Sequence, residues 1–68
     1  MKFRLQEIRE ARRLSQAELA RISGVPQPQI SMIENEKVPA PQIDTLYQLA
    51  EAMHCTVDAL IVRKKAAG

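Results

Sequence analysis

The spacing of apolar residues along this chain is that of helices, and it recurs too often to leave room for a sheet. Between residues 43 and 53, apolar residues return every three or four positions and share one helix face: Ile43, Leu46, Leu49, Ala50 and Met53. The sequence has only two glycines, no Asn-Gly or Asp-Gly turn and no Val/Ile/Thr alternation of the kind that marks strands. A chain of 68 residues with this pattern is predicted to be one small all-α domain.

Local signals divide the chain into short helices. The first is predicted at about residues 3–13, with Leu14 closing onto the core. Residues 15–18, Ser-Gln-Ala-Glu, have the pattern of a capping box, in which the serine hydroxyl accepts a hydrogen bond from the amide three residues on and the glutamate reaches back. A second helix is therefore expected at about residues 16–22, and Gly24 can adopt the left-handed backbone that ends it.

Two prolines surround Gln27 just before the next apolar residues. Because the first amides of a helix have no intrahelical partner, a proline in the first turn costs no hydrogen bond. Pro28 also pushes the residue before it toward an extended backbone. The third helix is therefore expected to have Gln27 at or just before its start and to end near Asn35, with Ile30 and Ile33 facing inward. Three of its residues are expected to face outward: Gln29, Ser31 and Met32.

The C-terminal part is expected to hold two more helices. Two prolines stiffen a connector at residues 37–41, and the amphipathic helix at residues 43–53 follows it. Thr56 is placed to cap a last short helix that carries Val57, Leu60 and Ile61. We expect one domain at residues 1–62 and a polar tail at residues 63–68.

Composition argues against several classes of function. Phe3 and Tyr47 are the aromatic residues of the sequence, too few for a protein that stacks single-stranded bases. His54 and Cys55 cannot complete a tetrahedral zinc site, and no acid stands at the spacing of a catalytic triad. We therefore expect no enzyme activity, no metal and no cofactor. The sequence lacks a long apolar run and a signal-peptide core, which predicts a cytoplasmic protein with no membrane partner, and the net charge of +2 permits an anionic partner.

Two short helices joined by a glycine-containing turn make a helix-turn-helix, whose second helix enters the DNA major groove. The chain resembles the Cro and phage-repressor type of this domain, the XRE family, from about residue 5 to residue 61. The matching segments are Ile8-Arg9, Leu14-Ser15-Gln16, Glu18-Leu19-Ala20, Gly24-Val25, Ile30-Ser31, Ile33-Glu34, Pro41, Thr45-Leu46, Leu49-Ala50 and Val57-Asp58-Ala59-Leu60. The resemblance implies a compact five-helix lambda-repressor-like fold, with the helix-turn-helix at helices 2 and 3, and sequence-specific binding of double-stranded DNA.

The start of the third helix is expected to contact bases. Gln27 occupies the position from which phage repressors of this family read an adenine, and a glutamine amide can bond adenine N6 and N7 together. Gln29 lies in the same turn. The family's second reading position falls on Pro28, which has no donor and can at most touch a thymine methyl group. Met32, one turn along, suits methyl contact or shape fit better than hydrogen bonding.

Other residues are expected to contact the DNA backbone or to support the reading helix. Gln16 begins the second helix, whose free amides and dipole suit a phosphate. Further phosphate contacts are expected from Ser31, Lys37, Arg13 and Arg21. The resemblance also implies an ion pair between Arg9 and Glu34, which would orient the reading helix rather than touch bases.

Two positions depart from the family pattern. Glycine is usual at the position of Glu36, and a carboxylate there weakens DNA affinity unless it points away from the phosphates. Glycine is also common at the position of His54, which must therefore tolerate a left-handed backbone.

The expected function is that of a transcriptional regulator, a repressor that binds a palindromic operator as a homodimer. One reading helix covers few base pairs, so a symmetric pair gains affinity and site length. Dimer contacts are expected from apolar residues in and after the last helix: Leu60, Ile61 and Val62. The alternative is a protein-interaction module, either an antitoxin that caps a toxin and also binds DNA or an accessory subunit. A restriction-modification controller is a further alternative.

Overall fold

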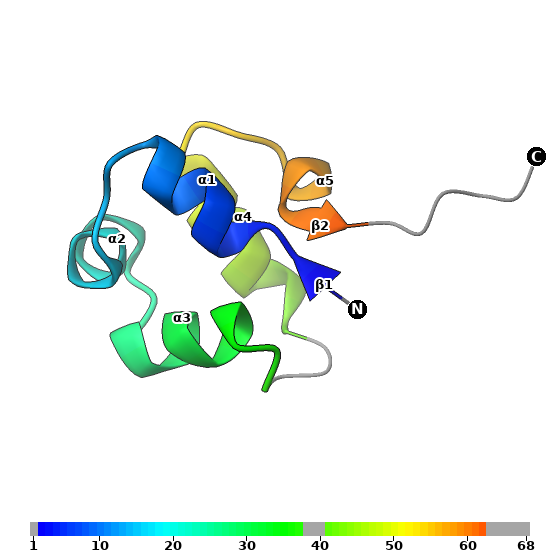
Figure 1. The fold of residues 1–68 in the computed structure, drawn as a ribbon, viewed down its shortest axis with the longest axis horizontal. Coiled ribbons are helices and arrows are strands. Elements are labelled where there is room, and N and C mark those ends of the chain that lie inside the picture. The colour runs from blue at the N-terminus through cyan, green and yellow to red at the C-terminus, as the bar shows by residue number, and fades with distance from the viewer. Residues whose placement is uncertain (1, 38–40, 63–68) are drawn as a thin grey trace, which may run out of the picture.

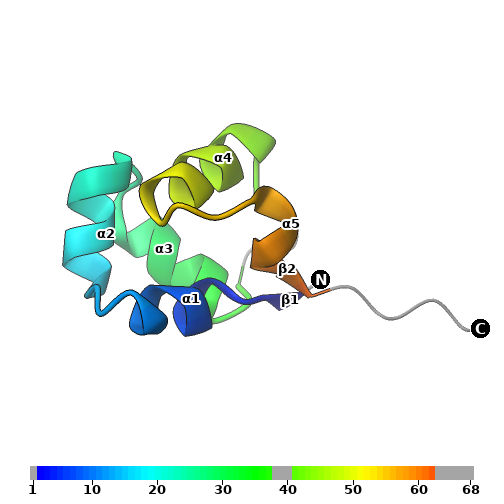
Figure 2. The ribbon, with the colours of Figure 1, turned by 90° about the horizontal axis from the view of Figure 1, so that it is seen from above.

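The computed structural model describes residues 2–37 and 41–62, which form five helices and one short pair of strands. Their bounds are β1 (Lys2–Phe3), α1 (Leu5–Ala11), α2 (Gln16–Ser23), α3 (Gln27–Glu34), α4 (Ile43–Ala52), α5 (Val57–Leu60) and β2 (Ile61–Val62). In Figure 1, α2 lies at one end of the molecule, α3 runs along its lower edge, and α5 lies with the strands at the other end. Figure 2 shows α1 and α4 on opposite sides. The expected five-helix, all-α fold class is confirmed.

The strand pair was not predicted, and it shortens two of the predicted helices. β1 and β2 are antiparallel, with Lys2 opposite Val62 and Phe3 opposite Ile61. The amide of Arg4 also donates to the carbonyl of Leu60 at 2.7 Å. As a result, α1 begins at Leu5 rather than near residue 3, and Ile61 belongs to β2 rather than to the last helix. The tail expected at residues 63–68 and most of the connector at 37–41 lie outside the described residues.

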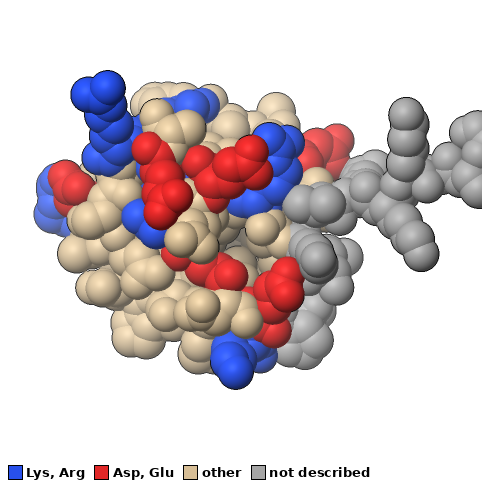
Figure 3. All heavy atoms as spheres, viewed as in Figure 1, with Lys and Arg blue, Asp and Glu red and all other residues tan. Residues whose placement is uncertain are grey.

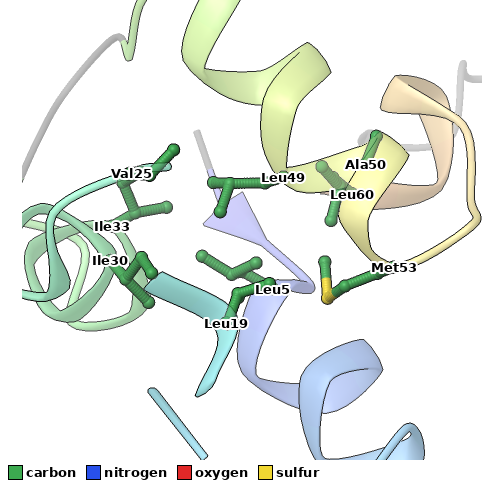
Figure 4. Close-up of a cluster of buried hydrophobic side chains, with 9 residues drawn as sticks. All are labelled: Leu5, Leu19, Val25, Ile30, Ile33, Leu49, Ala50, Met53 and Leu60. Atoms are coloured by element: carbon green, nitrogen blue, oxygen red, sulfur yellow. The ribbon is translucent and has the colours of Figure 1, made fainter. Parts of the chain in front are cut away.

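A cluster of buried apolar side chains from all five helices and from the turn after α2 forms the core (Figure 4). Its members are Leu5, Leu19, Val25, Ile30, Ile33, Leu49, Ala50, Met53 and Leu60. The amphipathic pattern of α4 is confirmed at Leu46, Leu49, Ala50 and Met53, which are buried. It is wrong at Ile43, whose side chain is 55% exposed because this first residue of α4 lies beyond the edge of the core.

The helix starts follow the capping signals in the sequence. The Ser15 hydroxyl accepts from the Glu18 amide at 3.0 Å, and the Ser15 amide donates to Glu18 Oε1 at 2.9 Å, which is the expected capping box. The Thr56 hydroxyl likewise accepts from the amide of Ala59 at 3.1 Å. Pro26 is the N-cap of α3, so Gln27 is its first residue and Pro28 lies in its first turn, as predicted.

Three helices end on a residue other than glycine in the left-handed conformation. Arg13 follows α1 with φ 58°, Glu36 follows α3 with φ 57° and His54 follows α4 with φ 55°. After each of them, an amide bonds back to a carbonyl five residues earlier, as in a Schellman motif; for α4, the amide of Cys55 donates to the carbonyl of Ala50 at 2.9 Å. The left-handed backbone expected at His54 is therefore confirmed, and α2 ends on Gly24 with φ 79°, also as expected.

Candidate nucleic-acid interface

The turn between α2 and α3 is short and anchored in the core. Gly24 takes the left-handed backbone that lets the chain leave α2, and Val25 buries its side chain under the turn. From there α3 begins at once, with Ile30 and Ile33 fully buried on its inner face. Because these two isoleucines fix the inner face, the opposite face of α3 must point away from the molecule.

The outer face of α3 begins with a free glutamine and two apolar side chains. Gln27 and Pro28 are exposed, and Met32 is 45% exposed. The side-chain amide of Gln27 makes no hydrogen bond with any residue that the structure describes, so it is available to a ligand. Figure 3 shows that the surface over the start of α3, at the lower left, is uncharged, whereas charged groups gather over α1 above it.

Gln29 differs from the outward orientation that the sequence predicted. Its side chain is half-buried, and its Nε2 lies 3.4 Å from Oγ1 of Thr45, a buried residue of α4. The physical reason is its position on the helix: Gln29 precedes the buried Ile30 and lies on the side of α3 from which its amide reaches Thr45 of α4. The two glutamines of the first turn are therefore not equivalent, and Gln27 is the one left without an internal partner.

A buried polar network holds the end of α3 against α1 and α2. Arg9 Nε donates to Glu34 Oε2 at 2.7 Å, and Arg9 Nη2 donates to Oε1 at 3.2 Å. Gln16 Nε2 donates to the same Oε1 at 2.8 Å, and Arg9 Nη1 donates to the carbonyl of Leu14 at 2.7 Å. The hydrogen bond to Glu34 raises the pKa of Arg9 above its ordinary value. The ion pair implied by the resemblance is thus present, and it is joined by Gln16, whose amide nitrogen is engaged within the molecule.

The other residues expected to contact phosphates lie on the surface around α2 and α3. Arg13 in the turn after α1, Arg21 on α2 and Lys37 after α3 are all exposed. Ser31 is half-buried, and its hydroxyl and carbonyl oxygens both accept from Asn35 Nδ2, at 3.2 and 2.8 Å. Glu36, the residue after α3 with the left-handed backbone, is exposed as well. Its carboxylate therefore lies on the surface, and the residue precedes Lys37 in the sequence.

The residues predicted for the dimer contact are not all at the surface. Leu60 is 1% exposed and belongs to the core, so its side chain offers no surface to a second copy in this structure. Ile61 is half-buried, and the side chain of Val62 lies outside what the structure describes. Ile61 instead lines an open groove of about 550 Å³ between α4 and α5. The other residues of this α4–α5 groove are Ile43, Tyr47, Ala50, Cys55, Thr56, Val57 and Asp58.

His54 and Cys55 occupy structural positions at the end of α4. His54 is exposed in the left-handed turn, and Cys55 packs partly buried against the core, where burial raises the pKa of its thiol. Within the described residues, no group of three or more His, Cys, Asp or Glu side chains could hold a metal ion. In the same part of the chain, no helix has the length and apolar character needed to cross a bilayer.

One contact had no signal in the sequence. Arg12, the C-cap of α1, donates from Nε to the carbonyl of Met53 at 2.9 Å, which joins the end of α1 to the end of α4. A basic residue at a helix end is ordinary in sequence, and only the packing of α1 against the C-terminal turn of α4 selects this carbonyl as its partner.

Comparison with known proteins identifies the class to which this geometry belongs. The sequence model of the helix-turn-helix family matches residues 5–60, so the chain belongs to this family, in its XRE branch, and the resemblance noted above is confirmed. A protein of Mycobacterium tuberculosis, named provisionally as the antitoxin HigA2, is 32% identical over 59 residues. The aligned region is 87% of this chain and 58% of that protein, so the chain spans less than two thirds of its relative's length.

Proposed function

We propose that this domain is a sequence-specific transcriptional regulator, a repressor that binds a palindromic DNA operator as a homodimer through α3. The observation that carries the proposal is the exposed outer face of α3, held outward by two buried isoleucines. An α-helix with one anchored face and one free face is the element that fits the major groove, which is about 12 Å wide. The family match supports the same use of the helix pair α2 and α3.

Gln27 is the residue best placed to read a base. It lies at the first position of α3 and is exposed, and its side-chain amide has no partner within the described residues. A glutamine amide both donates and accepts, so it matches adenine N7 and N6, and a good bidentate pair contributes about 1–3 kcal/mol of discrimination. Arg13, Arg21 and Lys37 are exposed cations that would contact phosphates on either side.

The homodimer is proposed to form through the α4–α5 groove. Ile43 and Tyr47 on its rim are 55% and 60% exposed, which is unusual for large apolar side chains that lie one helical turn apart. No lining residue comes from α2 or α3, so two copies can meet there without covering the reading helix. A symmetric pair would present two α3 helices to half-sites roughly 34 Å apart.

The second candidate function is that of an antitoxin, which binds DNA and also caps a toxin. The named relative favours it, because its name assigns it as an antitoxin. Co-purification of this chain with the product of a small neighbouring gene, and relief of that product's toxicity by this chain, would support the antitoxin assignment. If neither co-purification nor relief of toxicity is observed, the antitoxin function is rejected and the transcriptional regulator remains the proposed function.

Selection of bound duplexes from a random pool, followed by sequencing, tests the regulator. We expect a palindromic site that outcompetes random duplex, with affinity that falls steeply as salt is added, because each phosphate contact releases counterions. Gln27→Ala should relax the preference at one base step in each half-site and keep the fold. Gln48→Ala, a change of the same type at an exposed residue of α4, should leave the preference unchanged. Equal affinity for selected and random duplexes would overturn the proposal.

A further inference from the structure

The reading helix carries no cation, which limits the bases that it can recognise. The eight residues of α3, Gln27–Glu34, include no Lys, Arg or His. Their one carboxylate, on Glu34, has a side chain that is 3% exposed and is bonded to Arg9. Guanine O6 and N7 are read above all by Arg or Lys, whereas glutamine matches adenine. The hydrogen-bonding capacity of this helix therefore favours adenine over guanine.

A single side chain supplies most of that capacity. Gln29 Nε2 donates to Thr45 Oγ1 at 3.4 Å, and the hydroxyl oxygen of Ser31 accepts from Asn35 Nδ2 at 3.2 Å. Gln27 is the glutamine of α3 with no partner in the described chain. One amide pair discriminates at one base pair, so α3 needs a further contact to discriminate at a second base pair.

Pro28 and Met32 provide such a contact. They are four residues apart on a helix, so they lie one above the other on the same face, and both are exposed. Their separation along the axis is about 6 Å, close to two base-pair steps of about 3.4 Å each. Between them they form a short apolar strip beside Gln27. The only methyl group on an unmodified base edge in the major groove is the C5-methyl of thymine.

We propose that Pro28 and Met32 contact thymine C5-methyl groups about two base steps apart, so that the half-site of this protein is A·T-rich and is recognised largely by apolar contact. The inference rests on the proposed function, because it assumes that α3 enters the major groove. It adds the chemical class of the site: an adenine for Gln27, thymine methyls for the strip, and no guanine contact from α3.

Replacing thymine by uracil in the selected duplex tests this directly, because uracil keeps every hydrogen bond of thymine and lacks only the methyl group. Burying one methyl group contributes about 0.8 kcal/mol, so each uracil at a contacted position should weaken binding about fourfold. Met32→Ala should lose the penalty at one position, and Pro28→Ala should lose it at the other. Ile22→Ala, an exposed apolar residue on α2, is the matched control and should keep both penalties.

A second substitution separates methyl contact from DNA shape. A G·C pair at a contacted position should weaken binding, and 5-methylcytosine in that pair should restore part of the loss by returning a methyl group to the groove. Circular dichroism confirms folding of each variant, and Met32→Gln replaces Met32→Ala if the latter does not fold.

The outcomes distinguish this inference from the proposed function. A selected palindrome whose affinity is unchanged by uracil, or whose core is G·C-rich, overturns the methyl contacts and leaves the regulator standing. A uracil penalty that persists in both the Met32 and the Pro28 variants also overturns them. A pool that yields no preferred site overturns the proposed function and this inference with it.

Discussion

Glu34 lies where three helices meet, with only 3% of its side chain exposed. It belongs to α3, and it accepts from Arg9 of α1 and Gln16 of α2. A buried carboxylate is stable only when its charge is paired and its oxygens are hydrogen-bonded, and the described contacts supply both. At the scale of single residues, this network holds α3 in its orientation relative to α1 and α2.

Glu34→Gln is predicted to destabilise the protein strongly. The amide has the shape of the carboxylate but leaves the Arg9 guanidinium, itself largely buried, without its bonded counter-charge; the carboxylate that remains is that of the exposed Glu10, 4.0 Å from Nη2. Loss of one partner of a buried ion pair costs about 3–5 kcal/mol, and urea denaturation measures it. Glu7→Gln, which breaks the exposed pair with Arg4, is the control and should leave the unfolding free energy nearly unchanged.

The double variant Arg9→Met with Glu34→Leu sharpens this prediction. It removes both charges, so it should cost clearly less than the sum of the two single changes. Additive losses would show that Arg9 and Glu34 act independently and that the network does not hold α3.

The left-handed residues show what the sequence could and could not predict at this scale. Glu36 and His54 occupy positions where glycine is common in the family. A positive φ was therefore expected at His54, and the same argument explains the positive φ at Glu36. Arg13 has the same conformation, and nothing in its sequence context marks it. A left-handed residue with a side chain costs about 1–2 kcal/mol, and the paired carbonyls at the helix end offset that cost.

At the scale of elements, the starts of the helices were predictable because their signals are local. Ser15, Thr56 and Pro28 act within one turn of their own helix, so four or five letters of sequence contain the information. The β1–β2 pair was not predictable, because a strand of two residues is too short to show an alternating pattern. Each of the two strands exists only because it pairs with the other, which lies about 60 residues away in the sequence. The exposure of Ile43 was missed for a related reason. The periodic pattern predicts which face of α4 is apolar, but it does not predict how far along that face the core extends.

The capping box of α2 is predicted to make stability depend on pH. Hydrogen bonds from Ser15 hold the pKa of Glu18 below its ordinary value of 4.5. Between the folded and unfolded pKa values, the unfolded state binds more protons, so this contribution to stability is present above 4.5 and is lost as the pH falls through the folded pKa. Glu18→Gln keeps an acceptor but does not titrate, so it should flatten the fall in stability in acid.

Urea denaturation of wild type and Glu18→Gln, from near neutrality to below the ordinary glutamate pKa, measures the difference. Ser15→Ala is the companion variant: it removes the other half of the box and should cost about 1 kcal/mol of stability at neutral pH. If Glu18→Gln and wild type lose stability in parallel as the solution is acidified, Glu18 does not carry this part of the pH dependence.

At the scale of the whole molecule, the sequence predicted which face of α3 is buried. It did not predict which residues of other helices the α3 side chains contact. The direction of α3 follows from its two buried isoleucines, which are visible as a periodic pattern. The contact of Gln29 with Thr45 and the burial of Leu60 depend on how α4 and α5 pack, and that packing has no signature within either segment. The α4–α5 groove is likewise a property of the assembled fold, since its lining combines residues of α4, of the turn that follows it, of α5 and of β2.

If two copies meet through this groove, a charge placed in it should uncouple the two reading helices. Tyr47→Asp adds a carboxylate to the rim at a residue that is already 60% exposed, so the monomer should keep its fold. We expect the variant to bind a full palindrome about 2 kcal/mol more weakly, the loss typical of an interface anchor, and to bind an isolated half-site as wild type does. Gln48→Asp adds the same charge to the same helix at a residue that does not line the groove, and it should change neither affinity.

Analytical ultracentrifugation on DNA supplies the stoichiometry: two wild-type copies bind the palindrome cooperatively, whereas Tyr47→Asp binds without cooperativity. Cooperative binding of two Tyr47→Asp copies would place the dimer contact on another surface, because an added carboxylate that is buried and unpaired could not remain in the shared groove.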